Sequence, residues 1–349
     1  MAIAWMGNMP LLFSQTGITL PQASQKVNLT QRVGITDMTI TYSSPQVNGR
    51  ALWGQLIPLD QVWRAGANEN TTIRFAHDVQ VEGKPLSAGT YGLHMIPTSG
   101  DWTIIFSKNS TSWGSYSYRE AEDALRVQVK PQEGAHQEFL TYTFQNPASD
   151  GATLELAWGN MRVPVRISID THEIMLANIR NELRSSAGFS WMGYQQAANY
   201  CLQNGINYEE ALTWIDQSIS GSFGSEANFT NLSTKAQLLG KMNRQPESEV
   251  IMKEALAVAS NQELYSHGAQ LIGNGQNEQA MKVFQLQAER FPDTWLSYAG
   301  LAAGNRVQGN HKAALEYYRK AKVDAPHPWQ ASLDQRIASM EEAVQAAKK

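Results

Sequence analysis

The sequence predicts a two-part α+β protein, in which an antiparallel β-sandwich or jelly-roll-like barrel precedes a helical repeat array. Up to about Asp170, apolar and polar residues alternate in short runs, which is the period of half-buried strands. After about His172, apolar residues recur with helical spacing, and a pattern of small and large residues repeats after 34 residues. We therefore assign residues 25–170 to the β part and residues 171–349 to the helical part.

Composition limits the classes of function. The chain of 349 residues has 42% hydrophobic residues, 17% charged residues and a net charge of −4, so it is long enough for two cores. No basic excess or Lys/Arg cluster marks a surface for nucleic acid, and we expect no such partner. Cys201 is the single cysteine, so no intramolecular disulfide forms, and its helical neighbours predict a buried thiol.

Residues 1–24 form an apolar segment that becomes rich in Thr, Gln and Ser. The segment is typical of the end of a secretory signal with a cleavage zone near Phe13-Ser14-Gln15, although no positive charge precedes it. We predict an exported protein. Either the true start lies upstream of Met1, or residues 1–24 are an arm that packs on another surface. No later stretch reaches the roughly 20 apolar residues that span a bilayer, so no transmembrane segment is predicted.

Strand candidates with one apolar side follow one another through residues 25–170, separated by turn signals. Some eight to ten short strands of this kind predict two sheets that each bury one face. The Gly159-Asn160 pair separates two alternating runs and predicts a hairpin. The apolar sets are Met38, Ile40 and Tyr42; Ile73 and Phe75; Val79 and Val81; Trp102, Ile104 and Phe106; Leu140, Tyr142 and Phe144; Leu154, Leu156 and Trp158; and Val163, Val165, Ile167 and Ile169.

Polar and aromatic residues concentrate in segments 62–72, 89–97 and 107–114, which strand packing does not explain. With residues 43–50 and the stretch from Trp158 to Pro164, these segments resemble the bacterial domain-of-unknown-function 2911 family. The resemblance covers about residues 25–170. It implies an exported bacterial protein and implies no activity, because the family has none assigned.

The candidate ligand site is centred on segment 62–72, which offers an aromatic wall, an arginine, two amides and a carboxylate. This set suits a saccharide or a carboxylated small molecule. Other loops complete the rim if they share one end of the sandwich. The alternative is structural, with Arg64 paired to Glu69 and both asparagines bound to backbone groups. The candidates are Trp63, Arg64, Asn68, Glu69, Asn70, His94, Lys108, Ser112 and Trp113.

Known catalytic and metal-binding spacings are not found in the sequence. His172-Glu173 begins like a zinc-protease helix, but Leu176 stands where the second histidine belongs. There is no phosphate-binding loop, no Gly-x-Ser-x-Gly and no Cys-x-x-Cys, so we assign no catalytic residue, metal or cofactor. One alternative is a hydrolase of a saccharide or ester, with Glu69 or His94 as the acting group and Arg64 as electrostatic stabiliser.

The helical part is predicted to contain a connecting helix over residues 171–184, four helix pairs and a terminal helix after Pro328. Gly275, Ala280, Phe284 and Pro292 recur 34 residues later as Gly309, Ala314, Tyr318 and Pro326. This part resembles the tetratricopeptide family, strongly in the last two pairs and loosely before them, where Ala236, Ser248 and Met252 mark the second pair.

The resemblance implies a concave surface for a peptide or protein. The alternative is that the chain's own linker or the β part fills that groove. The predicted function is therefore an exported, non-enzymatic binding or scaffold protein. Its β part would bind a small polar ligand or an envelope component, and its repeats would contact another protein or a second copy. A further alternative is a structural subunit of an extracellular assembly that docks through the N-terminal arm.

Overall fold

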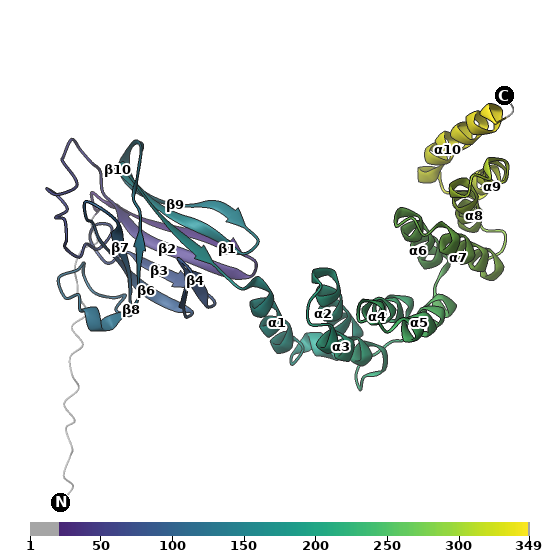
Figure 1. Cartoon of the computed structure of the whole chain (residues 1–349), viewed down its shortest axis with the longest axis horizontal. Coiled ribbons are helices and arrows are strands. Elements are labelled where there is room, and N and C mark those ends of the chain that lie inside the picture. The colour runs from purple at the N-terminus through teal and green to yellow at the C-terminus, as the bar shows by residue number, and fades with distance from the viewer. Residues whose placement is uncertain (1–20, 348–349) are drawn as a thin grey trace, which may run out of the picture. The chain divides into compact units, whose positions relative to one another are not determined.

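A computed structural model describes residues 21–347, which form two compact units that divide between Asn178 and Ile179. Most of the predicted N-terminal arm lies outside the described residues. The first unit is built of antiparallel strands and the second of helix pairs (Figure 1). The two-part α+β class predicted from the change of period is confirmed.

The strands of the first unit form two antiparallel sheets. One sheet has the order β1-β2-β3-β6-β7-β8 and the other β5-β4-β10-β9. The strands are β1 (Gln25–Val33), β2 (Thr36–Ser44), β3 (Thr72–Phe75), β4 (Val79–Val81), β5 (Lys84–Leu86), β6 (Gly89–Ile96), β7 (Trp102–Ser107), β8 (Asp123–Val129), β9 (Gln132–Ala148) and β10 (Gly151–Ser168), with a 3₁₀ turn at Glu120–Glu122.

The core of this unit lies between the sheets and takes one face of each strand. Ile40 of β2, Phe75 of β3 and Leu156 of β10 are at most 1% exposed and belong to one apolar cluster. The alternation read from the sequence therefore marks the inward faces correctly. A group of four tryptophans, Trp53, Trp63, Trp102 and Trp158, extends this core under the long connection between β2 and β3.

The hairpin predicted at Gly159-Asn160 is wrong, because β10 runs without a turn from Gly151 to Ser168. A two-residue hairpin turn of this kind needs positive φ at both central residues. Among the described residues with positive φ, Gly159 (φ 57°) occurs without Asn160. The register against β9 shifts on both sides of Gly159, so the glycine forms a bulge. A Cβ there would lie 2.9 Å from Leu52 Cδ1, so the connection after β2 packs against this bulge.

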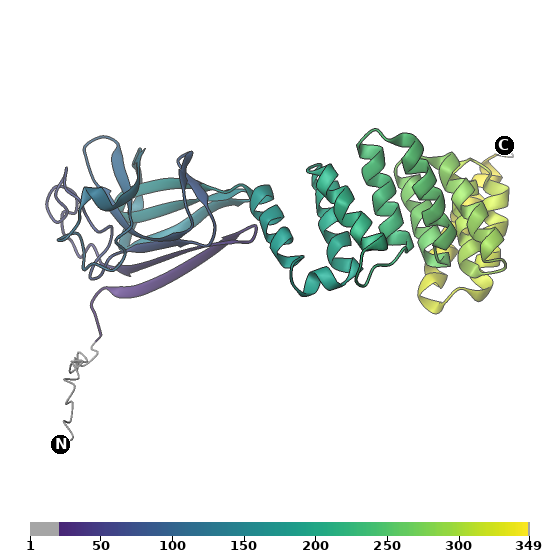
Figure 2. The ribbon, with the colours of Figure 1, turned by 90° about the horizontal axis from the view of Figure 1, so that it is seen from below.

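Helices α2 to α9 form four successive antiparallel pairs, which Figure 2 shows side by side. None of the helices described is long and apolar enough to cross a membrane. Cys201 is buried and free, as predicted. The helices are α1 (Thr171–Glu182), α2 (Trp191–Asn204), α3 (Tyr208–Ser220), α4 (Phe229–Lys241), α5 (Gln245–Val258), α6 (Asn261–Gly273), α7 (Asn277–Arg290), α8 (Trp295–Val307), α9 (His311–Asp324) and α10 (His327–Ala346), with a 3₁₀ turn at Ser186–Phe189.

Candidate functional site

A cavity of about 500 Å³ opens in the β unit where three separate segments meet. Residues 45–50 follow β2, residues 56–67 belong to the connection between β2 and β3, and Trp158 lies at the middle of β10. Ala23 and Ser24, just before β1, complete the rim. Its chemically active lining consists of two arginines, two indole rings and three amides, namely Arg50, Arg64, Trp63, Trp158, Gln46, Asn48 and Gln61.

The two arginines are oriented by backbone carbonyl groups rather than by acids. Arg64 Nη1 donates to the carbonyl of Asn68 at 3.0 Å. Arg50 donates through Nε to the carbonyl of Val47 at 3.0 Å and through Nη2 to that of Gln46 at 2.5 Å. No acidic residue lines the cavity, and within residues 21–347 neither guanidinium forms an ion pair. A guanidinium has five N–H donors, so both retain donors for a ligand.

The tryptophans give the cavity a rigid wall. Trp63 is 7% exposed and stacks on Trp158, with ring centroids 5.9 Å apart and an interplanar angle of 15°. The Trp53 ring packs edge-on against both. Offset-stacked and edge-to-face contacts of this kind add to the apolar burial of each ring. The wall therefore keeps its shape without a ligand.

The connection that carries Trp63 and Arg64 is held in an unusual backbone conformation. Ala65 (φ 51°) and Asn68 (φ 58°) both adopt the left-handed region, which is costly for residues other than glycine. Two hydroxyl groups, Tyr142 Oη at 2.9 Å and Thr71 Oγ1 at 3.1 Å, donate to the carbonyl of Ala65. Gly66 is required beside them, because a Cβ there would lie 2.5 Å from Thr71 Oγ1. Strained residues held in this way are frequent at binding sites.

The other candidate residues of segment 62–72 do not line the cavity. Asn68 Nδ2 donates to Gln22 Oε1 at 2.8 Å and to the carbonyl of Ser24 at 3.2 Å, which holds the chain before β1 at the cavity rim. Glu69 is half-buried, and no ion pair between it and Arg64 occurs in the described structure. The internal Arg64–Glu69 pair that we considered as an alternative is therefore not formed. Asn70 is buried and does not line the cavity.

His94 lies on the face of the six-stranded sheet that points away from the core, under the segment that connects β7 to β8. It is 2% exposed, and its Nδ1 lies 2.9 Å from Ser115 Oγ. Burial lowers the pKa of His94 to about 4, with Asp123 opposing the shift. The imidazole is therefore neutral at neutral pH. A Cβ on Gly92 would lie 3.3 Å from both His94 Nε2 and Asn70 Nδ2, so these two candidates flank one glycine.

Lys108, Ser112 and Trp113 lie on the segment between β7 and β8, and none of the three lines the cavity. Lys108 and Trp113 are exposed, and Ser112 Oγ accepts from Ser117 Oγ at 3.2 Å. The segment nevertheless touches the site, because Gly114 packs against the Arg64 side chain. Of the nine candidates, the structure brings Trp63 and Arg64 to the cavity, with Asn68 at its rim. Ligand binding by these residues stays a prediction.

Arg50, Gln61 and Trp158 were not among the candidates. A signal existed for two of them, because residues 43–50 and Trp158 belong to the segments that carry the family resemblance. Within residues 21–347, no three His, Cys, Asp or Glu side chains gather as a metal site.

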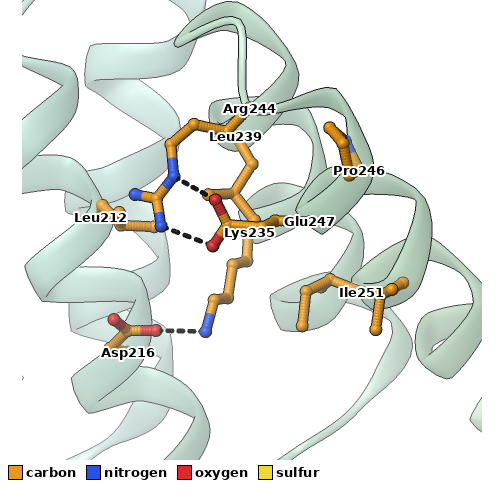
Figure 3. Close-up of a pocket in the computed structure, with 9 residues that line it drawn as sticks. Leu212, Asp216, Lys235, Leu239, Arg244, Pro246, Glu247 and Ile251 are labelled. Carbon is orange, nitrogen blue, oxygen red and sulfur yellow. Dashed lines mark hydrogen bonds and ion pairs between the residues drawn. The ribbon is translucent and has the colours of Figure 1, made fainter.

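The helical unit contains a different kind of pocket, of about 410 Å³, between its first and second pairs (Figure 3). Lys235 Nζ lies 2.7 Å from Asp216 Oδ1, and Arg244 binds Glu247 through two hydrogen bonds of 2.7 and 2.6 Å. The charged groups therefore pair with one another around an apolar interior that includes Leu212, Leu239 and Ile251.

The segments around the β cavity lie in a region that matches a family model. Residues 24–167 match the family model described as a protein of unknown function (DUF2911). The predicted resemblance of the β unit is confirmed, and the DUF2911 match includes every residue of the cavity lining except Ala23. No curated protein matches the chain.

Several solved structures resemble the helical unit. A tetratricopeptide repeat protein from Parabacteroides merdae is 18% identical over 50% of this chain and 66% of its own, with a TM-score of 0.32. YrrB, described as a TPR protein with an unusual peptide-binding site, is 18% identical over 47% and 83%, with a TM-score of 0.28. MamA from Desulfovibrio magneticus is 15% identical over 46% and 97%, with a TM-score of 0.26. The tetratricopeptide-like assignment itself follows from the repeat and the helix pairs of this chain.

Proposed function

We propose that this is an exported binding protein that holds a small carboxylated saccharide in the β cavity and contacts a partner protein, or a second copy, through its helical repeats. The observation that carries the ligand proposal is the pair of arginines beside a tryptophan wall. Neither arginine forms an ion pair among the described residues.

An anionic ligand follows from the charges. Arg50 and Arg64 each bring a positive charge to a cavity that no carboxylate lines. Glu138, which accepts from the backbone N–H of Asn48, interacts electrostatically with Arg50, so a bound anion would supply a countercharge above all for Arg64. A carboxylate accepts two parallel hydrogen bonds from one guanidinium, which fixes its orientation. Phosphate would satisfy the same donors, but the rest of the lining favours a sugar.

The saccharide assignment rests on the neutral residues. The part of the Trp63 ring that remains exposed offers an apolar contact to a sugar ring, and amides such as Gln46, Asn48 and Gln61 both donate to and accept from hydroxyl groups. The volume of about 500 Å³ lies within the range of small-molecule sites, roughly 300–1,000 Å³. A monosaccharide or disaccharide that carries a carboxylate, such as a uronic acid, combines these requirements.

Export is supported by the apolar composition of residues 1–15, which is typical of the end of a secretory signal. The partner-binding role is supported by the four stacked helix pairs, since such arrays present extended surfaces to proteins.

The test is calorimetric titration of the full chain with glucuronate and galacturonate, against glucose and galactose. We expect the acids to bind and the neutral sugars to bind at least tenfold more weakly. Arg64→Gln should weaken acid binding by about tenfold or more, since hydrogen bonds to charged groups contribute about 1.5–3 kcal/mol. Arg74→Gln, on the exposed part of β3, is the matched control and should bind like the parent protein. Equal binding of acids and neutral sugars, or no effect of Arg64→Gln, would contradict the proposal.

A further inference from the structure

The junction between the third and fourth helix pairs is filled by the chain itself. Phe284 of α7 is fully buried and packs against glycines of both pairs. A Cβ on Gly268 of α6 would lie 2.4 Å from the Phe284 ring, and one on Gly300 of α8 would lie 2.6 Å from it. The ring therefore occupies the space that these glycines leave, and the two pairs pack closely.

The second pair has a methionine at the corresponding position. Ala236, Ser248 and Met252 have the same spacing as Gly268, Ala280 and Phe284, so Met252 takes the place of the phenylalanine. In the second pair these positions are in direct contact, because Ser248 Oγ donates to the carbonyl of Ala236 at 2.7 Å. Unlike Phe284, Met252 is only half-buried.

A cavity of about 620 Å³ lies where the second and third pairs would otherwise meet. Its apolar surface comes from both pairs, with Met252 and Leu256 of α5 facing Leu271 of α6 and Val283 of α7. The pairs remain joined beside the cavity, where the Phe229 ring lies 5.7 Å from His267 and Arg290 Nη1 donates to the carbonyl of Leu256 at 2.5 Å.

The polar lining of this cavity is mostly made of side-chain amides. Gln270, Asn274, Gln276 and Gln279 line it. All four are exposed, and their amide groups make no hydrogen bond to another of the described residues. An amide offers both a donor and an acceptor, which is what the N–H and C=O groups of a peptide backbone require. The lining contains one Glu and one Lys, so it carries no net formal charge from these residues. The pocket of Figure 3 differs, because two ion pairs already satisfy its charged groups.

We propose that the cavity between the second and third helix pairs binds an extended, uncharged peptide segment of a partner protein, with one aromatic side chain seated on Met252, Leu256 and Leu271. The aromatic ring would fill the space that Phe284 fills at the next junction, and the amides would bind the peptide backbone. Met252 suits this role because an unbranched thioether adapts its shape and contacts aromatic rings favourably. The inference rests on the proposed role of the repeats in protein contact and specifies where and what they bind.

The test uses the full chain labelled with ¹³C at its methionine methyl groups, and two fluorescein-labelled heptapeptides as probes. One has the sequence Ser-Gln-Gly-Phe-Gly-Gln-Ser, and the other has Ala in place of Phe. We expect the Phe peptide to shift the Met252 methyl resonance and to bind at least tenfold more tightly than the Ala peptide. Met252→Leu assigns the resonance.

Three variants decide whether the cavity itself is the site. Met252→Phe places a ring where Phe284 has one, so it should raise the melting temperature and weaken binding of the Phe peptide at least tenfold. Val250→Phe puts the same ring at the Figure 3 pocket and should leave peptide binding unchanged. Gln279→Ala removes one amide at the rim without disturbing the apolar contacts, and should weaken binding several-fold even if Met252→Phe fails to fold.

The proposal is overturned if the Phe and Ala peptides bind equally, or if neither Met252→Phe nor Gln279→Ala affects binding. Loss of binding in Val250→Phe alone would also overturn it, while leaving the repeats as a protein-contact unit with its site at the other pocket. If neither peptide shifts the Met252 methyl resonance, the proposal fails, whereas the wider role of the repeats in protein contact does not depend on these peptides. The uronate titration of the β cavity then still reports independently on the ligand role.

Discussion

Acidification should destabilise the β unit through His94, because burial disfavours the protonated, charged form of its ring. The imidazole is 2% exposed, and its pKa is lowered from 6.5 to about 4. In the unfolded chain the ring binds a proton below about pH 6.5, whereas in the folded unit it does so only below about pH 4. The free energy of unfolding is therefore at its full value above the pKa of His94 in the unfolded chain. It decreases as the pH falls towards the pKa of His94 in the folded protein.

The magnitude follows from the two pKa values. Linkage over this interval gives a loss of about 2 kcal/mol in the free energy of unfolding between about pH 7 and pH 4.5. That is a large share of the roughly 5–15 kcal/mol by which a domain is stable. Replacing His94 with glutamine removes the titrating group while keeping an amide that can bind Ser115. The variant should be slightly less stable at pH 7 and should lose about 2 kcal/mol less on acidification.

The measurement is guanidinium unfolding of both proteins across this pH range, with the fluorescence of the clustered tryptophans as the probe. Carboxylates other than Asp123 titrate equally in the two proteins, so the difference between them reports on His94 and its interaction with Asp123. NMR titration of the His94 ring in the folded protein gives the pKa directly. Parallel pH dependences of the two proteins, or a folded pKa near 6.5, would refute the reasoning.

Two further predictions concern packing. Tyr142→Phe removes the hydroxyl that donates to the carbonyl of Ala65. It should therefore lower the free energy of unfolding by about 1 kcal/mol and speed hydrogen exchange in residues 62–72. The control is Tyr116→Phe, at an 87% exposed residue, which should change stability by less than about 0.5 kcal/mol. Gly300→Ala forces a Cβ to within 2.6 Å of the Phe284 ring, so thermal unfolding should show the helical unit destabilised by about 1–3 kcal/mol. The control is Gly273→Ala, where no atom lies within 4 Å of the new Cβ. It should be neutral or stabilising by up to about 1 kcal/mol.

The alternation of apolar and polar residues predicts the inward faces of the strands, because the face that a residue occupies depends only on its position along its own strand. Ile40, Phe75 and Leu156 are buried as their patterns require. The Gly159-Asn160 turn was predicted wrongly for a different reason. Whether a glycine makes a bulge or a hairpin depends on what lies beside it, and Leu52, more than 100 residues earlier, packs there. Such a contact is not visible in a local pattern.

The candidate site shows the same limit. Trp63 and Arg64 are adjacent in sequence, and their chemistry marks them as candidates. Arg50 and Trp158 become part of the same cavity only when the connection after β2 folds over β10. His94 and Lys108 both have polar neighbours in the sequence. The segment between β7 and β8 buries His94, whereas Lys108 on that segment lies in solvent. Sequence identifies the donors, but packing decides which of them meet.

The cavity between the second and third helix pairs has two causes that are readable in the sequence once the structure is known. Ala236 and Gly268 are separated by 32 residues, whereas Gly268 and Ala302 are separated by 34. The difference lies in the connections, because Ala259 and Ser260 alone join α5 to α6, while residues 291–294 join α7 to α8. The short connection limits how the third pair stacks on the second, and Met252 does not fill the space as Phe284 does. A degenerate repeat is therefore where an array of this kind opens, and there its interior becomes accessible to a partner.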